Sequence, residues 1–353
     1  MIKKKLLALF VVFVMMVTVM AGCSSGGGTD SGDSAKTGDG PKASPTLAGK
    51  DINKDNIKIA YIPFSTAGYT NVLAEKASND FREAYPNVEV NFFDAGYDPT
   101  TQISLLSECI AQKYDGVIME VSDSVALSPT IIEAEEAGIP VISLNMGTDT
   151  LHTLHLESNS YSSGWLGGEA IDKALGGKGN VVILDVPAQI KATALFGTGF
   201  EDYIAENTEF KVLDAQPIDG FSQEEANTVM SNLLTKFDDI NAVYCAADTV
   251  AMGAIQAIDA AGRDKDGILI WGSAAYPSAL DAIDAGKMYG TSWEDLYSVV
   301  KMALNMELYF IASGINSISA GYTATPSLYE PFVAVTKDNS DAIKPQTRWP
   351  EYS

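Results

Sequence analysis

The chain has 353 residues, 46% of them hydrophobic, and carries 46 acidic against 23 basic side chains, a formal net charge of −23. That length and apolar content predict two globular domains rather than one. The negative charge argues against nucleic acid as a partner, and three cysteines are too few to indicate a disulfide framework.

The amino-terminal segment predicts export. Lysines at 3–5 precede an unbroken apolar run at 6–20, as in a secretory signal peptide, and the run is shorter than the ~20 residues that a spanning helix needs. Cys23 follows V-M-A-G, which resembles the lipobox of bacterial lipoproteins and implies cleavage before Cys23 and acylation of its thiol, as with palmitate. The alternative is an uncleaved anchor helix. Either form keeps the body on the extracytoplasmic face of the cell membrane.

The predicted signal peptide covers 1–22, and a flexible tether is expected at 23–56. The tether consists of Gly, Ser, Asp, Lys and Pro with almost no large apolar side chain, so it cannot bury enough surface to offset the chain entropy lost on folding. Without the three signal lysines, 20 basic side chains remain against 46 acidic ones, a net charge of −26. We interpret this acidity as a solubility feature of an exported surface.

From residue 57 onward, short β-branched runs alternate with amphipathic stretches. The first series has the strands IKIAYI, VEVNFF, GVIME and IPVISL, with helices expected at 69–85, 101–114 and 128–137. After a crossing segment near 155–159 and a helix at 161–175, the alternation restarts with NVVILDV, FKVLDAQPI, AVYCA and ILIWGS. Strand, helix, strand is the pattern of a parallel sheet covered on both faces. Two similar α/β lobes are therefore expected.

A repeated sequence pattern within the chain indicates two copies of one lobe. YDGVIMEVSDSVAL and INAVYCAADTVAM each join a buried strand to a helix, with Asp123 or Asp248 at the junction. The simplest interpretation of both is an N-cap that accepts hydrogen bonds from free backbone N–H groups. Asp248 is also a candidate ligand contact.

The chain crosses between the lobes once more, at YGTSW, where a long helix begins, and again before the last strand, PFVAV. Three crossings make a hinge, which restricts motion to opening and closing of a cleft between the carboxyl ends of the two sheets. The expected amino-terminal lobe is 57–157 with 294–320, and the expected carboxyl-terminal lobe is 158–293 with 321–353.

These segments, in this order, resemble the ribose-binding-protein-like, type I periplasmic binding family, from Ile57 to about Ile343. The helix GWLGGEAI, the GTGF helix start, ALDAIDAGKM and the closing FVAVTKDN also carry the resemblance. It implies an α/β fold of two Rossmann-like lobes on a three-segment hinge, and the role of substrate-binding lipoprotein of a sugar-type ABC transporter. The family's repressors have an amino-terminal DNA-binding helix-turn-helix, and here a signal peptide takes its place.

The resemblance also implies candidate ligand contacts after the first strand. Sugar binders of this family place stacking rings there, and this chain offers Phe64 and Tyr69, with the hydroxyl of Ser65 between them. The alternative is that one of the two rings only packs against the start of the helix. Asn145 and Met146 stand where many relatives have Asp-Arg.

Other family positions depart from the pattern. Ala194 stands where a second Arg is frequent, and Ala274 where an Asp is usual. Only the Asp of an Asn-Asp pair survives, as Asp248 after Ala247. Because bidentate Arg is the usual clamp for planar anions, its absence favours a neutral ligand. Lys191 is the one cation expected near the cleft mouth, either lining it or solvated.

At the late hinge strand, Glu294 replaces an amide beside Trp293, and this pair resembles one in the rhamnose- and autoinducer-binding branches of the family. Aromatic and acidic candidates together would equally suit an amine-bearing ligand through cation–π and carboxylate contacts. These candidates are Tyr69, Tyr276, Trp293, Glu120, Asp248 and Glu294.

Catalysis, a metal and a cofactor are not expected. The only histidines, His152 and His155, lie in a strand-like segment without a third ligand nearby, and no triad order is evident. We expect a monomer that captures a small neutral polar ligand, a sugar above all, by lobe closure and delivers it to an ABC permease with a cytoplasmic ATPase. The alternatives are an autoinducer, nucleoside, polyol or amine-bearing ligand, a sensory receptor that presents its ligand, or an enzyme that turns over a cleft-bound solute.

Overall fold

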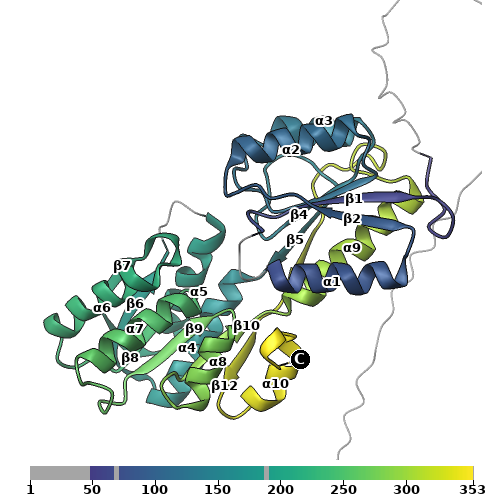
Figure 1. Ribbon diagram of the computed structural model, residues 1–353. Helices are drawn as coiled ribbons and strands as arrows, with labels where there is room; N and C mark the ends of the chain where they lie inside the picture. The colour runs from purple at the N-terminus through teal and green to yellow at the C-terminus, as the bar shows by residue number, and fades with distance from the viewer. Residues whose placement is uncertain (1–47, 67–70, 187–190, 353) are drawn as a thin grey trace, which may run out of the picture. The chain divides into compact units, whose positions relative to one another are not determined.

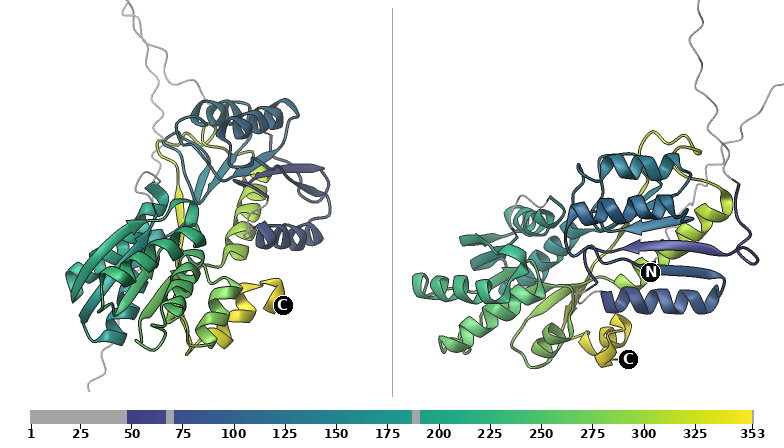
Figure 2. Two further views of the ribbon diagram at one scale, coloured as in Figure 1. Left: turned by 60° about the vertical axis from the view of Figure 1, so that its left-hand side comes forward. Right: turned by 45° about the horizontal axis from the view of Figure 1, so that its top comes forward.

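The first lobe is built on a six-stranded sheet in the order β2-β1-β3-β4-β5-β11, shown in Figure 1. The computed structural model describes residues 48–352 apart from 67–70 and 187–190. Helices α1 and α9 cover one face of this sheet, and α2 and α3 cover the other, as the views of Figure 2 also show. The elements are β1 (Ile57–Ile62), α1 (Asn71–Ala84), β2 (Val88–Phe92), α2 (Pro99–Ala111), β3 (Gly116–Met119), α3 (Ser128–Glu136), β4 (Val141–Leu144), β5 (Leu154–Ser158), α9 (Leu296–Ser313) and β11 (Ser327–Glu330).

The second lobe repeats this plan with the strand order β7-β6-β8-β9-β10-β12. Helices α4 and α5 pack together on one face, and α6, α7 and α8 lie on the other. The elements are α4 (Ser160–Leu175), β6 (Lys178–Asp185), α5 (Lys191–Asn207), β7 (Glu209–Pro217), α6 (Gln223–Lys236), β8 (Ala242–Cys245), α7 (Asp248–Ala260), β9 (Leu269–Ser273), α8 (Pro277–Asp284), β10 (Gly290–Trp293), β12 (Val333–Thr336) and α10 (Ser340–Thr347).

The strands therefore follow the same order in both sheets, as the repeated sequence pattern predicts. The central strands β3, β4 and β8 are buried along their whole length, as expected for parallel strands covered on both faces. The last strand of each sheet differs, because β11 runs parallel to β5 whereas β12 runs antiparallel to β10. The predicted fold class is confirmed.

Three short connections join the lobes. The first is at Asn159, between β5 and α4, the second at 294–295, between β10 and α9, and the third at 331–332, between β11 and β12. The backbone N–H of Asn159 donates to the carbonyl oxygen of Glu330 at 3.1 Å, so the first and third connections lie side by side.

Two of these connections also begin helices. The side chain of Asn159 accepts a hydrogen bond from the N–H of Ser162 at the start of α4, and Asp295 accepts one from Ser298 at the start of α9. Each side chain satisfies an N–H group that the helix itself leaves free. The connections are therefore held in defined positions at both of these helix starts.

One strand was assigned to the wrong lobe from sequence. The segment 321–353 was expected in the carboxyl-terminal lobe, but β11 pairs with β5 in the first sheet. The segment 155–159, expected as a crossing, is mostly β5 itself, and the crossing begins only at its end. Both strands are short and partly polar, so neither shows the apolar run of a central strand.

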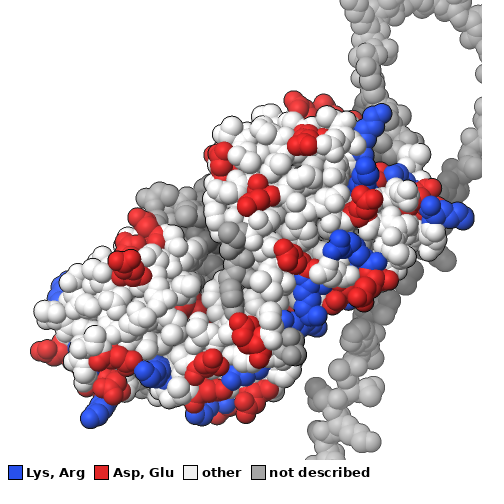
Figure 3. All heavy atoms as spheres, in the orientation of Figure 1, with Lys and Arg blue, Asp and Glu red and all other residues white. Residues whose placement is uncertain are grey.

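The described surface is acidic, in line with the charge of the chain. Figure 3 shows carboxylates spread over the visible face of both lobes, with the basic groups between them. No helix in 48–352, outside the two gaps, is long and apolar enough to cross a membrane. Cys23 and Tyr69 lie outside the described residues, as does the side chain of Lys191.

Candidate ligand-binding cavity

A cavity of about 340 Å³ opens at the carboxyl ends of the strands of both sheets. Met146 follows β4, Ala247 follows β8, and Ala274 follows β9, and all three line it. This is the edge at which open α/β sheets bind their ligands, and the volume is within the range of small-molecule sites. The small side chains of Ala247 and Ala274 leave the space open.

All three connections between the lobes contribute to the wall of this cavity. Ser158 and Ser160 flank the first connection, Glu294 lies in the second, and Phe332 lies in the third. A molecule in the cavity therefore touches both lobes and the hinge that joins them.

Five aromatic rings provide the apolar part of the wall. The rings of Phe196 and Phe332 meet edge to face with centroids 6.0 Å apart. Tyr276 is braced from behind by Trp349, at 5.8 Å. Phe64 and Phe221 complete the set. Such rings stack on the C–H faces of sugars or attract cations.

Glu120 holds two of the lining residues in place from behind the cavity. One of its carboxylate oxygens accepts a hydrogen bond from the N–H of Phe64 at 2.9 Å, and the other accepts one from the amide of Asn145 at 3.3 Å. Asn145 has a φ of 58°, a left-handed conformation that Asn tolerates better than most residues. Burial raises the pKa of Glu120, and these two hydrogen bonds act in the opposite direction.

Glu294 presents a second carboxyl group directly to the cavity. Burial raises its pKa to about 7. The hydroxyl of Ser158 lies near enough to lower that pKa, while the charges of Glu120 and Glu330 raise it further. Glu294 is therefore poised to gain or lose a proton near neutral pH.

Three polar atoms of the wall remain without a hydrogen bond among the described residues. They are Oδ1 of Asn145, Oγ of Ser158 and Oε2 of Glu294, and all are buried. A buried acceptor without a donor is costly. A ligand that donates hydrogen bonds would satisfy all three.

Asp248 supports the cavity instead of lining it. Its carboxylate is fully buried and accepts hydrogen bonds from the hydroxyl of Thr291 at 2.6 Å and the N–H of Tyr276 at 2.8 Å. The loop that it holds contains Ala274 and Ala275 at φ values of 118° and 52°, a conformation that costs non-glycine residues about 1–3 kcal/mol each. Burial raises the pKa of Asp248 to about 7.

The N-cap prediction for both aspartates needs correction. Helix α7 begins at Asp248 itself, after Ala247, and no side chain caps it. Asp123 does accept hydrogen bonds from the N–H groups of Val125 and Ala126, at 2.9 Å each, but in a turn that precedes α3. Asp123 and Asp248 occupy equivalent positions in the order of strands and helices of their lobes, but their side chains have different roles.

The remaining sequence candidates are divided. Phe64, Asn145, Met146, Tyr276 and Glu294 line the cavity, and their contact with a ligand stays a prediction. Ser65 is buried and Trp293 lies in the hydrophobic core of the second lobe, and neither is part of the cavity wall. Trp293 ends a strand, and the side chains of successive residues in a strand point to opposite faces, so it and Glu294 cannot both face the ligand.

Several wall residues were not predicted from sequence. Ser158, Phe196, Phe221 and Phe332 come from four separate segments of the chain. Their approach depends on where the connections fold, which a local pattern does not report. The position of Ser158 and Phe332 beside the lobe crossings was the only available signal.

Both histidines already have hydrogen-bond partners within the protein. The hydroxyl of Ser143 lies 2.7 Å from Nε2 of His152 and 2.8 Å from Nδ1 of His155, whose Nε2 contacts Glu157 at 2.9 Å. Burial lowers the pKa of His152 to about 4. Within the described part of the chain, no group of three His, Cys, Asp or Glu side chains is arranged to hold a metal.

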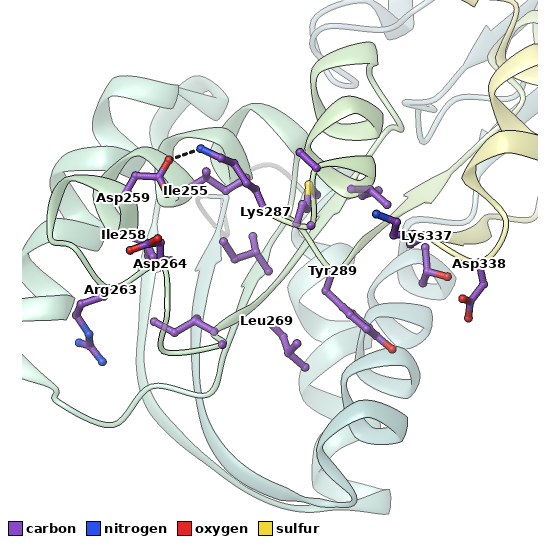
Figure 4. A pocket seen from close by; sticks show the side chains of 18 residues that line it. Ile255, Ile258, Asp259, Arg263, Asp264, Leu269, Lys287, Tyr289, Lys337 and Asp338 are labelled. Atoms are coloured by element: carbon purple, nitrogen blue, oxygen red, sulfur yellow. Dashed lines mark hydrogen bonds and ion pairs between the residues drawn. The ribbon is translucent and has the colours of Figure 1, made fainter.

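A larger cavity, of about 600 Å³, lies at the amino-terminal edge of the second sheet (Figure 4). Its three cations already have partners: Lys287 pairs with Asp259 at 2.7 Å, Arg263 pairs with Asp266 at 2.6 Å, and Lys337 donates to the carbonyl oxygen of Asp284 at 2.6 Å. It lies at the opposite edge from the one at which such sheets bind ligands. We therefore assign the ligand to the smaller cavity.

The chain has two lobes of the same architecture, joined by three connections that all line one cavity. This arrangement defines a solute-binding protein. The chain belongs to the periplasmic binding protein domain family, whose model matches residues 59–312. It is 27% identical to a putative rhizopine-binding protein of Rhizobium meliloti, over 76% of this chain and 86% of that protein. It is also 27% identical to the ribose import binding protein of Escherichia coli, over 70% of this chain and 82% of that protein.

Among solved structures, it resembles a myo-inositol binding protein of Caulobacter bound to myo-inositol. The TM-score is 0.70 at 25% sequence identity, and the match covers 82% of this chain and 96% of that protein. The predicted family is thereby confirmed.

Proposed function

We propose that the protein captures a small polyhydroxylated solute outside the cytoplasm and delivers it to an ABC importer. The observation that carries this proposal is the cavity, which is lined by both lobes and all three connections. The names of the relatives, which include ribose and myo-inositol binding proteins, support a sugar or polyol.

The wall chemistry agrees with a ligand that has no negative charge. No Lys or Arg is among the described residues of the wall; Lys191, the cation predicted near the cleft mouth, has its side chain outside the described residues. Rings for stacking alternate with acceptors for hydroxyl groups. A phosphate or carboxylate would meet carboxyl groups instead of a guanidinium clamp.

Capture is proposed to proceed by closure about the three connections. A solute that contacts residues of both lobes stabilises the arrangement in which those contacts form together, and so shifts the population toward it. That arrangement would be the one recognised by the permease. Cys23 would hold the protein at the membrane through its lipid anchor, and the tether that follows it would give the lobes reach.

A thermal-shift screen of the purified protein tests this proposal. A ligand that binds only the folded state at a concentration 100 times its Kd stabilises that state by about 2.7 kcal/mol, so sugars and polyols should include one that raises the midpoint. Phe64→Ala should abolish the shift. Tyr309→Ala removes a ring that is 57% exposed and should leave it unchanged. Failure of every sugar and polyol to shift the midpoint would refute the proposal.

A further inference from the structure

One carboxyl group lies in the cavity wall, two more lie close to it, and no counter-charge is among the described wall residues. Glu294 faces the cavity, Glu120 lies behind Asn145, and Glu330 is near enough to raise the pKa of Glu294. Arg348 is bound to Asp295, the neighbour of Glu294, with its guanidinium 3.1 Å from the carboxylate. Among the described wall residues, no cation is left to balance Glu294.

A second observation points to a ligand at the same place. Oε2 of Glu294 and Oδ1 of Asn145 are buried acceptors that receive no hydrogen bond among the described residues. Ser158, only 6% exposed, lines the cavity beside Glu294, and its hydroxyl can both donate and accept. The two acceptor oxygens therefore lack donors at the place where a ligand would lie.

The hydroxyl groups of a neutral sugar could donate to these acceptors, but they bring no counter-charge for an ionised Glu294. An ammonium group brings three donors and a positive charge, and charge-assisted hydrogen bonds are roughly twice as strong as neutral ones. The rings of Phe196, Phe332 and Tyr276 line the same space, and aromatic faces attract cations. Carboxylates and rings together match a cationic group better than a neutral one.

We propose that the captured solute is a polyhydroxylated molecule that carries a protonated amino group, and that Glu294, flanked by Glu120, receives the ammonium. This inference rests on the proposed function and specifies the ligand class of the same cavity. It replaces the neutral ligand expected from sequence, because the missing arginines exclude anions without distinguishing a neutral ligand from a cation.

Matched probes test the inference by calorimetric titration of the purified full-length protein. The pairs are glucose with glucosamine, sorbitol with 1-amino-1-deoxysorbitol, and myo-inositol with an amino-deoxy-inositol, and an N-acetylated form of each amine serves as a neutral control. We expect the amine of at least one pair to bind ten or more times more tightly than its hydroxyl partner, and N-acetylation to remove that gain.

The pH dependence of the binding affinity provides an independent test. Since the ammonium requires an ionised Glu294, affinity for the amine should rise with pH between 5.5 and 7, approaching tenfold per pH unit, and then level off. The carboxyl groups of Glu120 and Glu330 and the Asp295–Arg348 pair surround this group and broaden the transition. The affinity of the hydroxyl partner should not follow this course.

Glu294→Gln should remove the preference for the amine, so that the amine binds no more tightly than its hydroxyl partner to the same variant. Glu209→Gln changes an exposed glutamate and should alter neither. If Glu294→Gln does not fold, the pH series of the wild-type protein decides. Neutral members that bind as tightly as amines would overturn the inference and leave the proposed function intact, whereas binding of neither class would overturn both.

Discussion

Replacement of Asp248 by Asn isolates the energetic cost of the carboxylate that holds the loop after β9. Asn keeps one oxygen for the backbone N–H groups of Ala275 and Tyr276, and its NH2 group can donate to the hydroxyl of Thr291, which in the wild-type protein donates to Asp248 at 2.6 Å. The geometry of the loop is thus preserved while the ionisable group is lost. The variant therefore measures the effect of the charge on stability and not the effect of the hydrogen bonds.

The magnitude follows from the raised pKa of Asp248. Its ordinary pKa of 3.8 applies in the unfolded chain, and the folded value is about 7. Between these values the unfolded chain binds fewer protons than the folded one, so the free energy of unfolding falls as pH rises, by about 1.4 kcal/mol per unit. Between pH 4.5 and 7.5, Asp248→Asn should therefore gain about 3 kcal/mol of stability relative to the wild-type protein.

Urea unfolding at pH 4.5, 6.0 and 7.5, followed by circular dichroism, measures this difference. Asp123→Asn is the matched control, because Asp123 has the same place in the chain order of the other lobe and is exposed. Its stability should track that of the wild-type protein at all three pH values. The reasoning fails if the advantage of Asp248→Asn does not grow with pH, or if the control gains as much.

Three further predictions concern other sites. Glu307 is fully buried, and burial raises its pKa well above 4.5. The free energy of unfolding of Glu307→Gln should therefore rise relative to that of the wild-type protein by about 1.4 kcal/mol per pH unit above 4.5, until the pH reaches the pKa of Glu307 in the folded protein. Urea melts that show a constant difference would contradict this. Ala247→Leu, at a φ of −150° that any residue adopts, should fill the cavity and abolish the ligand-induced thermal shift; an unchanged shift would remove that cavity from consideration. Cys23→Ala should move the protein from the membrane fraction to the soluble fraction, and retention in the membrane would favour an uncleaved anchor.

The fold was largely predictable because its central strands are buried on both faces. Runs such as GVIM and AVYC are apolar along their length, and the order of strands and helices then leaves few topologies. The edge strand β11 has the sequence SLYE and is mostly exposed. Its place is determined by pairing with β5, which no local pattern reports.

The cavity was only partly predictable, for two physical reasons. Adjacent residues at a strand end face opposite sides, so a sequence pair such as Trp293-Glu294 contains one core residue and one wall residue without showing which is which. Asp248 was a candidate contact because it stands at the Asp of an Asn-Asp pair in the family that the chain resembles, but its hydrogen bonds with Thr291 and Tyr276 turn it toward the protein. Only the tertiary structure makes that distinction.

The segment 327–336 has a consequence for how the chain folds. It supplies β11 to the edge of the first sheet and β12 to the edge of the second, so neither sheet is complete before this late segment has been synthesised. Pairing of strands so distant in sequence is intrinsically slow. We therefore expect the two lobes to unfold in one cooperative transition, and the chain to stay incompletely folded until this segment has been synthesised.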